Sequence, residues 1–256
     1  MDNKQYIKSP LNYVGGKYKI LNQIIPKFPK EINTFVDLFG GGFNVGINVN
    51  SKKVIYNDII IPLCELMKFF STTTADKLIE KLEKNILVNN LNKENTDSFL
   101  QLRNKFNHQL YENDEDRILD FYTLILYSFN YQIRFNKDLK YNTPFGKNRS
   151  SYNSNTKTNL KKFIKKINGI ELNVTNTKFD KFNFSKLTCD DFVYCDPPYL
   201  ITTGSYNDGN RGIKDWTENE EQKLLQILDE LNERNIKFAL SNVFEANGKK
   251  NQLLIG

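Results

Sequence analysis

The sequence is poor in the residues that most often carry enzyme chemistry by themselves. Its 256 residues include one histidine, His108, and three widely spaced cysteines, Cys64, Cys189 and Cys195. A serine–histidine or cysteine–histidine pair is disfavoured, because His108 lies in a polar helical segment, FLQLRNKFNHQL, that is typical of an exposed surface. The cysteines are odd in number and form no CxxC pattern, which argues against a disulfide framework or a metal site and indicates a reducing cytoplasm.

Long apolar runs are also absent. No segment approaches the roughly 20 apolar residues needed to span a bilayer, and the N-terminal MDNKQYIKSPLNY lacks the apolar core of a signal peptide. With 39% hydrophobic residues, 26% charged residues and a mean hydropathy of −0.56, the composition predicts a soluble protein with one sizeable domain and a smaller lobe. No membrane association is expected.

Positive charge is concentrated in one part of the chain. The net charge is +6, yet residues 134–166 hold ten basic residues and one acidic residue. The basic residues are Arg134, Lys137, Lys140, Lys147, Arg149, Lys157, Lys161, Lys162, Lys165 and Lys166. A polyanionic partner is favoured for the loop that precedes residue 158. The lysines of NLKKFIKKI (159–167) lie opposite an apolar helical face, so an ordinary solvated surface explains them equally well.

Short strands and helices alternate at both ends of the chain. The predicted strands are TFVDLF (34–39), KVIYND (53–58), ELNVTN (171–176), DFVYCD (191–196) and KFALSN (237–242). Helices are predicted at 43–49, 61–70, 74–86, 96–107, 114–129 and 159–167, after the capping box that begins at Thr217, and within 245–256. This alternation predicts an α/β fold with a parallel sheet. Residues 60–165 would form a second lobe, inserted into a domain of residues 1–59 and 166–256.

Glycines follow the first predicted strand, at the place where open α/β sheets bind nucleotide-like ligands. The dinucleotide fingerprint GxGxxG is not met, because valine stands three residues after Gly42, and VGGKYK is not a phosphate-binding P-loop. Asp58 ends the second strand about 20 residues further on, where an acid binds the two hydroxyls of a ribose. A ribose site without provision for phosphate indicates an adenosine cofactor such as S-adenosylmethionine. A structural turn beside a solvated Asp58 is the alternative.

Two prolines follow the predicted strand 191–196. The carboxylate of Asp196 and the carbonyl of Pro197 would accept hydrogen bonds from the exocyclic amine of a base and stabilise the positive charge that develops on its nitrogen during attack. Pro197 and Pro198 fix the backbone, because the φ angle of proline is held near −65°. Tyr199 offers a ring on which a base extruded from a duplex can stack.

These motifs, in this order, resemble those of the Dam/DpnM-type DNA adenine-N6 methyltransferases (D12 class, alpha group). SPLNYVGGK (9–17) is similar to the N-terminal cofactor motif of that family, FVDLFGGG (35–42) to its glycine motif, YND (56–58) to its ribose-binding acid and DPPY (196–199) to its catalytic loop. FNKDLKYNTPFGKNRSSY (135–152) resembles its target-recognition hairpin and LSN (240–242) its late strand. The resemblance implies a Rossmann-like S-adenosylmethionine-dependent methyltransferase sheet with a helical and hairpin target-recognition insertion.

The resemblance also implies roles for single residues. The target adenine would be held and activated by Asp196, Pro197, Pro198 and Tyr199. The cofactor would be bound by Tyr13, Gly15, Gly16, Lys17, Asp37, Phe39, Gly40, Gly42, Asp58 and Asp196. DNA would be contacted by Arg134, Asn136, Lys137, Asn142, Pro144, Lys147 and Arg149. The implied activity is methylation of adenine N6 in double-stranded DNA at a GATC-like target, by a monomer that can serve beside a cognate restriction endonuclease.

The chain departs from the family pattern at three places. Asn12-Tyr13 replaces the usual Lys-Trp, and Asp138 stands where a basic base-reading residue is common. Lys178 displaces an acid that contacts the cofactor adenine, and Asp180 is the candidate to replace it. Relatives also continue beyond this C-terminus, so a catalytically weak relative that binds DNA without methylating it is one alternative. Methylation of protein glutamine is another, although those enzymes carry asparagine in place of Asp196 and lack a basic hairpin.

Overall fold

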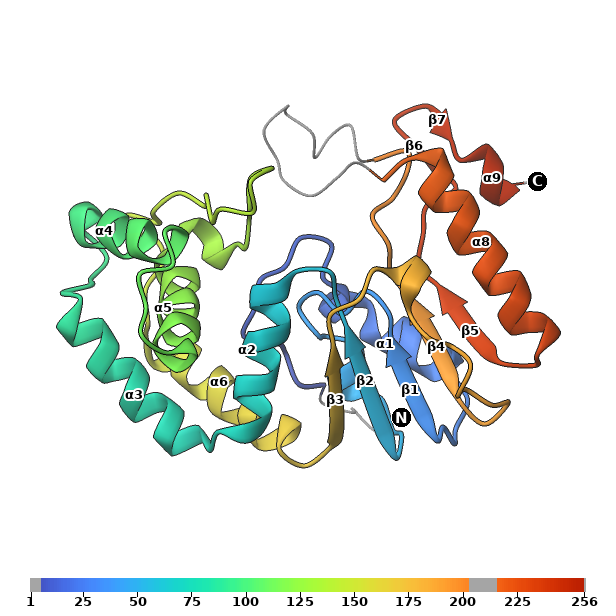
Figure 1. Ribbon diagram of the computed structural model, residues 1–256, viewed down its shortest axis with the longest axis horizontal. Helices are drawn as coiled ribbons and strands as arrows, with labels where there is room; N and C mark the ends of the chain where they lie inside the picture. The colour runs from blue at the N-terminus through green and yellow to red at the C-terminus, as the bar shows by residue number, and fades with distance from the viewer. Residues whose placement is uncertain (1–5, 203–215, 256) are drawn as a thin grey trace.

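Five parallel strands form the central sheet of the computed structural model, which describes residues 6–202 and 216–255 (Figure 1). Across the sheet the order is β3 (Glu171–Thr175), β2 (Lys53–Asn57), β1 (Thr34–Asp37), β4 (Phe192–Cys195) and β5 (Lys237–Leu240). All five strands were predicted from the sequence. The predicted α/β fold with a parallel sheet is confirmed.

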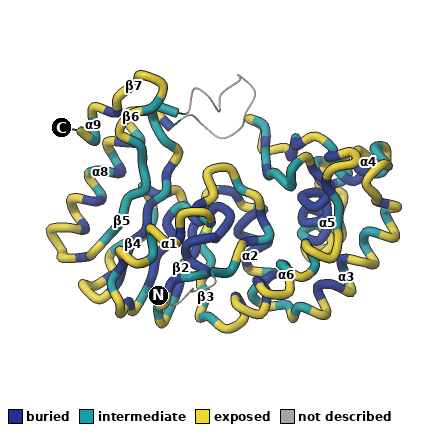
Figure 2. The backbone as a smooth tube through the Cα atoms, turned by 180° about the vertical axis from the view of Figure 1, so that it is seen from behind, coloured by how far each residue is buried: buried dark blue, intermediate teal, exposed yellow. Residues whose placement is uncertain are grey.

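Both faces of the sheet are covered, which explains why β1 and β4 are apolar at consecutive positions. Phe35 and Tyr194 lie in one core cluster with their ring centroids 6.4 Å apart, whereas Val36 and Val193 lie in the other. Helix α8 (Glu218–Glu233) covers the second cluster and begins with the predicted capping box. All four residues of β4 and three of the four in β1 are buried, and Figure 2 shows a further long buried stretch along α5 (Asp114–Tyr127).

Five helices stand between β2 and β3 in the chain and beside the sheet in space (Figure 1). They are α2 (Ile61–Thr72), α3 (Ala75–Val88), α4 (Thr96–Asn107), α5 (Asp114–Tyr127) and α6 (Ser154–Ile167). The ring centroid of Phe70 on α2 lies 5.1 Å from that of Tyr122 on α5 and 5.9 Å from that of Phe163 on α6. All three rings belong to the core cluster that also contains Phe35. One apolar core therefore runs from the sheet into the helices. The division into two lobes stays a prediction.

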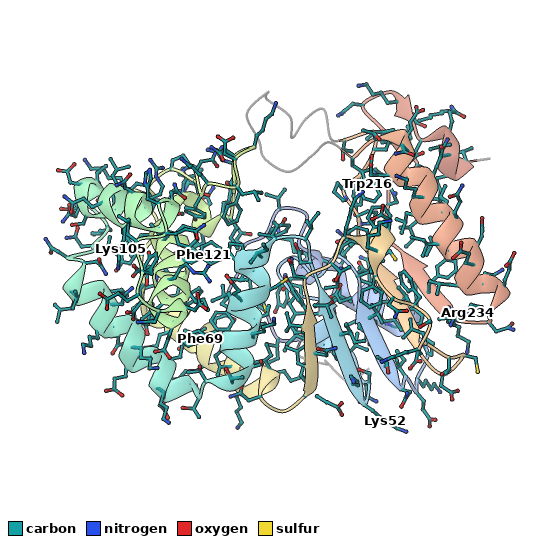
Figure 3. All side chains as sticks on the ribbon, in the orientation of Figure 1. Lys52, Phe69, Lys105, Phe121, Trp216 and Arg234 are labelled. Atoms are coloured by element: carbon teal, nitrogen blue, oxygen red, sulfur yellow. The ribbon has the colours of Figure 1, made fainter. Side chains whose placement is uncertain are left out.

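A buried carboxylate joins three of these helices. Asp120 of α5 is 1% exposed and accepts hydrogen bonds from Lys105 of α4 at 2.8 Å, from Tyr111 at 2.8 Å and from Asn85 of α3 at 2.9 Å. Figure 3 labels Lys105 and the neighbouring Phe121. These hydrogen bonds to one buried carboxyl group tie α3 and α4 to α5.

Two of the predicted helices are wrong. FNVGINV (43–49) contains only a three-residue 3-10 turn, η3 (Gly46–Asn48), because Phe43 has a φ of 59° and packs edge-on against the ring of Tyr56. Residues 245–255 begin with the antiparallel pair β6 (Glu245–Ala246) and β7 (Lys249–Lys250) and end in a single turn, α9 (Gln252–Ile255). Asn247 and Gly248 have φ angles of 51° and 74°, as the two-residue turn of a hairpin requires.

The remaining elements among the described residues are short. They are the 3-10 turns η1 (Lys17–Ile20), η2 (Ile25–Lys27), η4 (Phe129–Tyr131) and η5 (Phe179–Lys181), and the one-turn helix α1 (Leu21–Ile24). In the part of the chain that the structure describes, no helix has both the length and the apolar character needed to cross a membrane.

Candidate active site

The carboxyl ends of β1, β2 and β4 meet at one edge of the sheet. Because β2 and β4 lie on opposite sides of β1, this edge contains the topological switch point at which open α/β sheets bind their ligands. The glycine turn follows β1, Asp58 follows β2, and Asp196 follows β4. In Figure 3, Trp216 marks this edge and Lys52 marks the opposite, amino edge.

Asp196 is held from two sides. The Lys17 ammonium donates to its Oδ2 at 2.5 Å, and the Tyr199 hydroxyl donates to its Oδ1 at 3.1 Å. Lys17 also donates to the carbonyl of Gly15 at 2.7 Å and lies 5.3 Å from the centroid of the Tyr199 ring. Burial raises the pKa of Asp196 above its ordinary value, and the charge of Lys17 opposes that rise. Lys17 thus favours the charged form of a largely buried carboxylate.

The loop that presents Lys17 is built on a tight turn. The amide of Gly16 donates to the carbonyl of Tyr13 at 3.1 Å, and Gly15 has a φ of 80°, which the third position of a type II turn reserves for glycine. Tyr13 packs on the glycine turn, since a Cβ at Gly41 would lie 3.1 Å from its ring. The structure therefore brings the N-terminal motif, the glycine turn and Asp196 together, as the sequence predicted.

Gly40 has no room for a side chain. A Cβ there would lie 2.3 Å from the ring of buried Tyr56, whose hydroxyl donates to the carbonyl of Gly41 at 2.9 Å. Gly42 is also crowded, since its Cβ would lie 3.2 Å from Tyr13. These glycines are therefore required for the turn to pack against the sheet and the N-terminal motif.

Two buried carboxylates flank the glycine turn. Asp58 accepts from the amides of Gly41 and Ile60, both at 2.8 Å, and Asp37 accepts from the amide of Gly46 at 3.1 Å. Burial raises the pKa of Asp37 to about 8 and that of Asp58 to about 6. The negative charges of Asp196 and Asp58 add to the rise in the pKa of Asp37, so the three carboxylates form one electrostatic cluster.

Phe39, a predicted cofactor residue, belongs to an aromatic cluster. Its ring centroid lies 5.5 Å from that of Phe179 and 5.7 Å from that of Trp216, which are 5.1 Å from each other. Glu221 of α8 is 1% exposed and accepts a hydrogen bond from the Trp216 indole at 2.5 Å. It also accepts one from the side-chain amide of Asn242, which follows β5, at 2.9 Å. Sequence reasoning missed Trp216, although it is the one tryptophan and directly precedes a capping box.

Sequence reasoning also missed Asn57, which joins two loops at this edge. Its amide donates to the carbonyls of Leu38 at 3.0 Å and Thr177 at 2.9 Å, and its oxygen accepts from the Thr177 amide at 3.1 Å. Asn57 is 1% exposed. An asparagine at the end of an apolar strand was the available signal, because a buried amide needs partners.

Asp180, the expected substitute for the acid at Lys178, lies in η5 beside Phe179. Its Oδ2 accepts from Lys178 at 3.2 Å, and its side chain is 14% exposed. Its Oδ1 is buried and has no hydrogen-bond partner among the residues of the described structure. An unpaired, buried acceptor therefore lies next to Phe179 of the aromatic cluster.

The hairpin expected to recognise DNA is present. Phe135 pairs with Tyr141 in an antiparallel bridge, and the amide of Asn142 donates to the carbonyl of Arg134 at 3.0 Å. The guanidinium of Arg134 bonds the side-chain and main-chain oxygens of Asn142, both at 2.9 Å. Asn136 accepts from two main-chain amides at the tip, at 3.0 and 2.9 Å. These three predicted DNA-binding residues thus shape the hairpin itself.

The other four predicted DNA-binding residues have exposed side chains. They are Lys137, Pro144, Lys147 and Arg149. The Arg149 guanidinium lies 4.6 Å from the centroid of the Phe129 ring. These residues, unlike the three that brace the hairpin, are accessible to a large partner.

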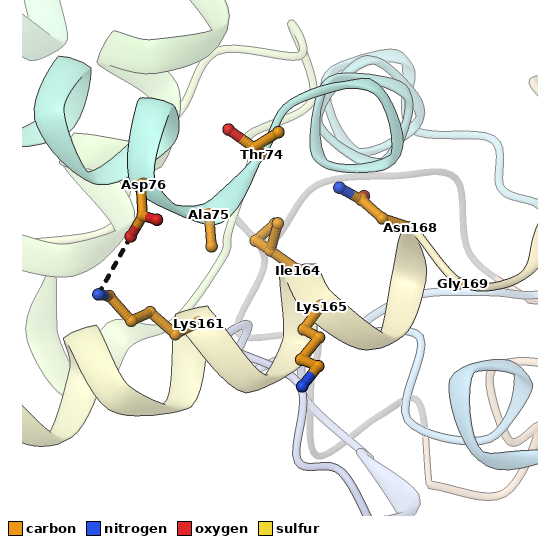
Figure 4. Close-up of a pocket in the computed structure, with 8 residues that line it drawn as sticks. All are labelled: Thr74, Ala75, Asp76, Lys161, Ile164, Lys165, Asn168 and Gly169. Atoms are coloured by element: carbon orange, nitrogen blue, oxygen red, sulfur yellow. Dashed lines mark hydrogen bonds and ion pairs between the residues drawn. The ribbon is translucent and has the colours of Figure 1, made fainter.

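The lysines of α6 lie elsewhere. Lys157 pairs with Glu83 at 2.6 Å and Lys161 with Asp76 at 3.2 Å, both acids of α3. Helix α6 ends just before the amino end of β3, so its last turn lies at the edge of the sheet opposite Asp196. A pocket between α6 and the start of α3 lies there too (Figure 4). These contacts favour the surface-helix explanation for the α6 lysines.

No metal chemistry is indicated by the described residues. Among them, no group of three or more histidine, cysteine, aspartate or glutamate side chains is placed to hold a metal ion. The three cysteines are free, and His108 is exposed at the C-terminal end of α4.

Comparison with known proteins identifies relatives along almost the whole chain. The chain is 51% identical over 251 residues to the modification methylase StsI of Streptococcus sanguinis and 52% identical over 250 residues to the type II methyltransferase M.FokI of Planomicrobium okeanokoites. Each match covers 98% of this chain but 38% of the relative, so the chain spans little more than a third of those proteins. The DNA adenine methylase of Escherichia coli K12 is 27% identical over 236 residues, which cover 91% of this chain and 79% of that protein.

The model of one protein family matches residues 13–254, which include the glycine turn, Asp58, the hairpin and Asp196. The chain belongs to the D12 class N6 adenine-specific DNA methyltransferase family.

Proposed function

We propose that this chain transfers a methyl group from S-adenosylmethionine to the N6 amine of adenine in double-stranded DNA. The observation that carries the proposal is Asp196, a largely buried carboxylate at the switch point, held by hydrogen bonds from Lys17 and Tyr199. The family and the names of its relatives support the same reaction. A buried, correctly oriented acceptor is what activation of an exocyclic amine requires.

The residues at the switch point fit S-adenosylmethionine. Three acids, Asp37, Asp58 and Asp196, face one lysine, Lys17, and burial raises the pKa of all three acids. A ligand with a sulfonium and an ammonium group would stabilise their charged forms and so be bound favourably. We infer that Asp58 accepts from the ribose hydroxyls. Asp180 is proposed to accept from the amine of the cofactor's adenine, which requires the side chains that cover its unpaired Oδ1 to move aside.

The aromatic cluster and the tight turns complete the cofactor site. Phe39 and Tyr13 would contact the cofactor from the two sides of the glycine turn, at Gly40 and Gly42. The loop at Gly15 and Gly16 is exposed, and a Cβ at Gly15 would meet nothing within 4 Å, so it can approach a ligand. When bound, S-adenosylmethionine supplies an electrophilic methyl group.

Catalysis would then rest on positioning and charge. Asp196 and the carbonyl of Pro197 accept the two N–H groups of the target amine, Pro198 restricts the backbone, and Tyr199 stacks on the extruded base. Each oxygen of Asp196 already accepts one hydrogen bond and has a second lone pair for the substrate. Lys17 keeps the carboxylate charged and therefore able to accept.

The exposed side of the hairpin is the proposed DNA surface. Lys137, Lys147 and Arg149 would contact phosphates, which position the duplex without reading its sequence. The target is proposed to be GATC-like from the family resemblance. The exposed Asp138 is a departure from that pattern, because an acid prefers the amine of cytosine to the acceptors of guanine. One recognition hairpin and one proposed active site in the described part of the chain suit a monomer. The relatives named as modification methylases support pairing with a cognate restriction endonuclease.

Transfer of tritium from labelled S-adenosylmethionine to duplex DNA tests the proposal. Wild-type protein should label DNA, and Asp196→Ala and Asp196→Asn should reduce the rate by at least about 10²-fold, as removal of a main electrostatic interaction does. Thermal unfolding of both variants checks that they fold. Labelling that survives both substitutions would refute the role of Asp196.

A further inference from the structure

The chain is strained where it leads into the recognition hairpin. Asn130 and Tyr131 have φ angles of 54° and 57°, so two successive residues other than glycine lie in the left-handed region. Asparagine adopts this conformation readily, whereas a bulky residue such as tyrosine does so rarely. Strained residues persist where their surroundings hold them, and they gather at functional sites. This turn lies at the base of the hairpin, because the amide of Phe129 donates to the carbonyl of Pro144 at 2.8 Å.

One contact that holds this turn comes from the N-terminal motif. The side-chain amide of Asn12 donates to the carbonyl of Asn130 at 2.7 Å, across 118 positions of sequence. Asn12 also forms an isolated parallel bridge with Gln132. Its side chain is exposed, so the contact adds little to the apolar core. Asn12 was one of the departures from the family pattern and has no role in the proposed reaction so far.

The segment from Asn12 to Lys17 reaches the active site directly. Tyr13 packs on Gly41, and Lys17 bonds Asp196 at 2.5 Å. One end of this short segment therefore touches the base of the hairpin, and its other end touches the carboxylate that would hold the target amine. A shift of the hairpin base would be transmitted to both Tyr13 and Lys17.

We propose that Asn12 is a positioning residue that couples the binding of DNA by the hairpin to the binding of cofactor at the glycine turn. The identities of the two ligands rest on the proposed function. A cofactor that orders Tyr13 and Lys17 also fixes the carbonyl of Asn130 and so the hairpin. Because coupling between two binding equilibria is reciprocal, it is measurable as tighter DNA binding in the presence of S-adenosylhomocysteine.

The test is the ratio of the DNA Kd without S-adenosylhomocysteine to the Kd with it, from fluorescence anisotropy of a labelled duplex. The duplex carries the target site of the wild-type protein, which is found by sequencing DNA that this protein has methylated. If no DNA is methylated, the duplex carries a site that the protein selects by binding from a random library. Asn12→Ala removes the donor, and Asn12→Asp replaces it with an acceptor of the same size. Asn168→Ala is the matched control, because Asn168 is also exposed and donates to a distant carbonyl, that of Thr73, at 3.0 Å.

Removal of one neutral hydrogen bond changes an equilibrium constant by about two- to tenfold. We expect both Asn12 variants to lower the coupling ratio by about this factor. Their melting temperature and their affinity for S-adenosylhomocysteine alone should match those of wild type, and Asn168→Ala should keep the full ratio. An unchanged ratio in Asn12→Ala, or no coupling in wild type, would overturn the inference. Wild-type coupling that depends on Asn12 but is accompanied by no methyl transfer would refute the proposed function instead.

Discussion

Lys17 controls the charge of Asp196, and its removal should change the pH dependence of the reaction. Without the ammonium, the pKa of Asp196 rises further, because burial already raises it and Lys17 opposes that rise. The proposed reaction needs the carboxylate, so activity should be lost as pH falls through this pKa. In Lys17→Met the acidic limb of the profile of kcat/KM against pH should therefore move to higher pH.

The matched control for this experiment is Lys19→Met, which removes an exposed lysine two residues away. Its profile should follow that of wild type. If the acidic limb of Lys17→Met stayed in place, the titration would not belong to Asp196.

Asp37 should release a proton when the cofactor binds. Burial raises its pKa to about 8, so the free protein carries it mostly protonated at pH 7. A cationic ligand lowers the pKa of a nearby carboxyl group, and the proton then leaves. Titration calorimetry of S-adenosylmethionine in two buffers of different ionisation enthalpy should show net proton release approaching one per site. Asp37→Asn cannot release this proton, so equal release by that variant would assign it to another group.

At the residue scale, the sequence was informative where chemistry restricts residue type. Asp196, Tyr199 and Asp58 could be proposed from the sequence because few residue types suit the tasks proposed for them. Asn57 was missed because its role depends on the carbonyls of Leu38 and Thr177, which only the folded sheet brings together. The unpaired oxygen of Asp180 is likewise a property of the fold.

At the element scale, the turn after β1 should not tolerate a side chain at its first glycine. A Cβ at Gly40 would lie 2.3 Å from the ring of Tyr56, which is buried and unable to move freely. Gly40→Ala should lower the free energy of unfolding by about 1–3 kcal/mol, as overpacking typically does, measured by urea denaturation. Gly169→Ala, whose Cβ would be 3.5 Å from the nearest atom, should change it little. If Gly40→Ala were as stable as Gly169→Ala, the turn after β1 would be able to rearrange to accommodate a side chain.

The strands were predictable within one or two residues, since apolar runs of this length bounded by polar residues are typical of parallel sheets buried on both faces. The segment 43–49 was misread because its apolar spacing resembles that of a helix, whereas the positive φ of Phe43 is imposed by packing on Tyr56. The Asn247-Gly248 hairpin was signalled by the sequence and overlooked.

At the scale of the whole molecule, two basic surfaces compete for the role of DNA site. The exposed cations beside the hairpin should bind phosphates, and those of α6 should not. Replacing both Lys147 and Arg149 by alanine should reduce the slope of log K against log salt by about 0.9 for each phosphate that the variant no longer neutralises. Replacing both Lys162 and Lys165 by alanine removes the same charge from α6 and should leave the slope unchanged. The opposite outcome would place DNA on the helix.

The order of motifs along the chain predicted the fold better than the distribution of charge predicted the DNA-binding surface. Charge alone marks residues 134–166 as one basic stretch, and the amphipathic pattern of 159–167 left the role of its last lysines open. The fold divides that stretch, because Lys157 and Lys161 pair with acids of α3 while Lys147 and Arg149 remain exposed. Such pairing between distant segments leaves no local signal in a sequence.

The identity of the methylated atom tests the proposed reaction most directly. Duplex DNA and protein are incubated together with the wild-type chain and S-adenosylmethionine, then digested and examined by mass spectrometry. We expect N6-methyldeoxyadenosine with wild type and its disappearance with Asp196→Asn. No methylated adenine in DNA, or a methyl group found on protein glutamine instead, would contradict the proposed function.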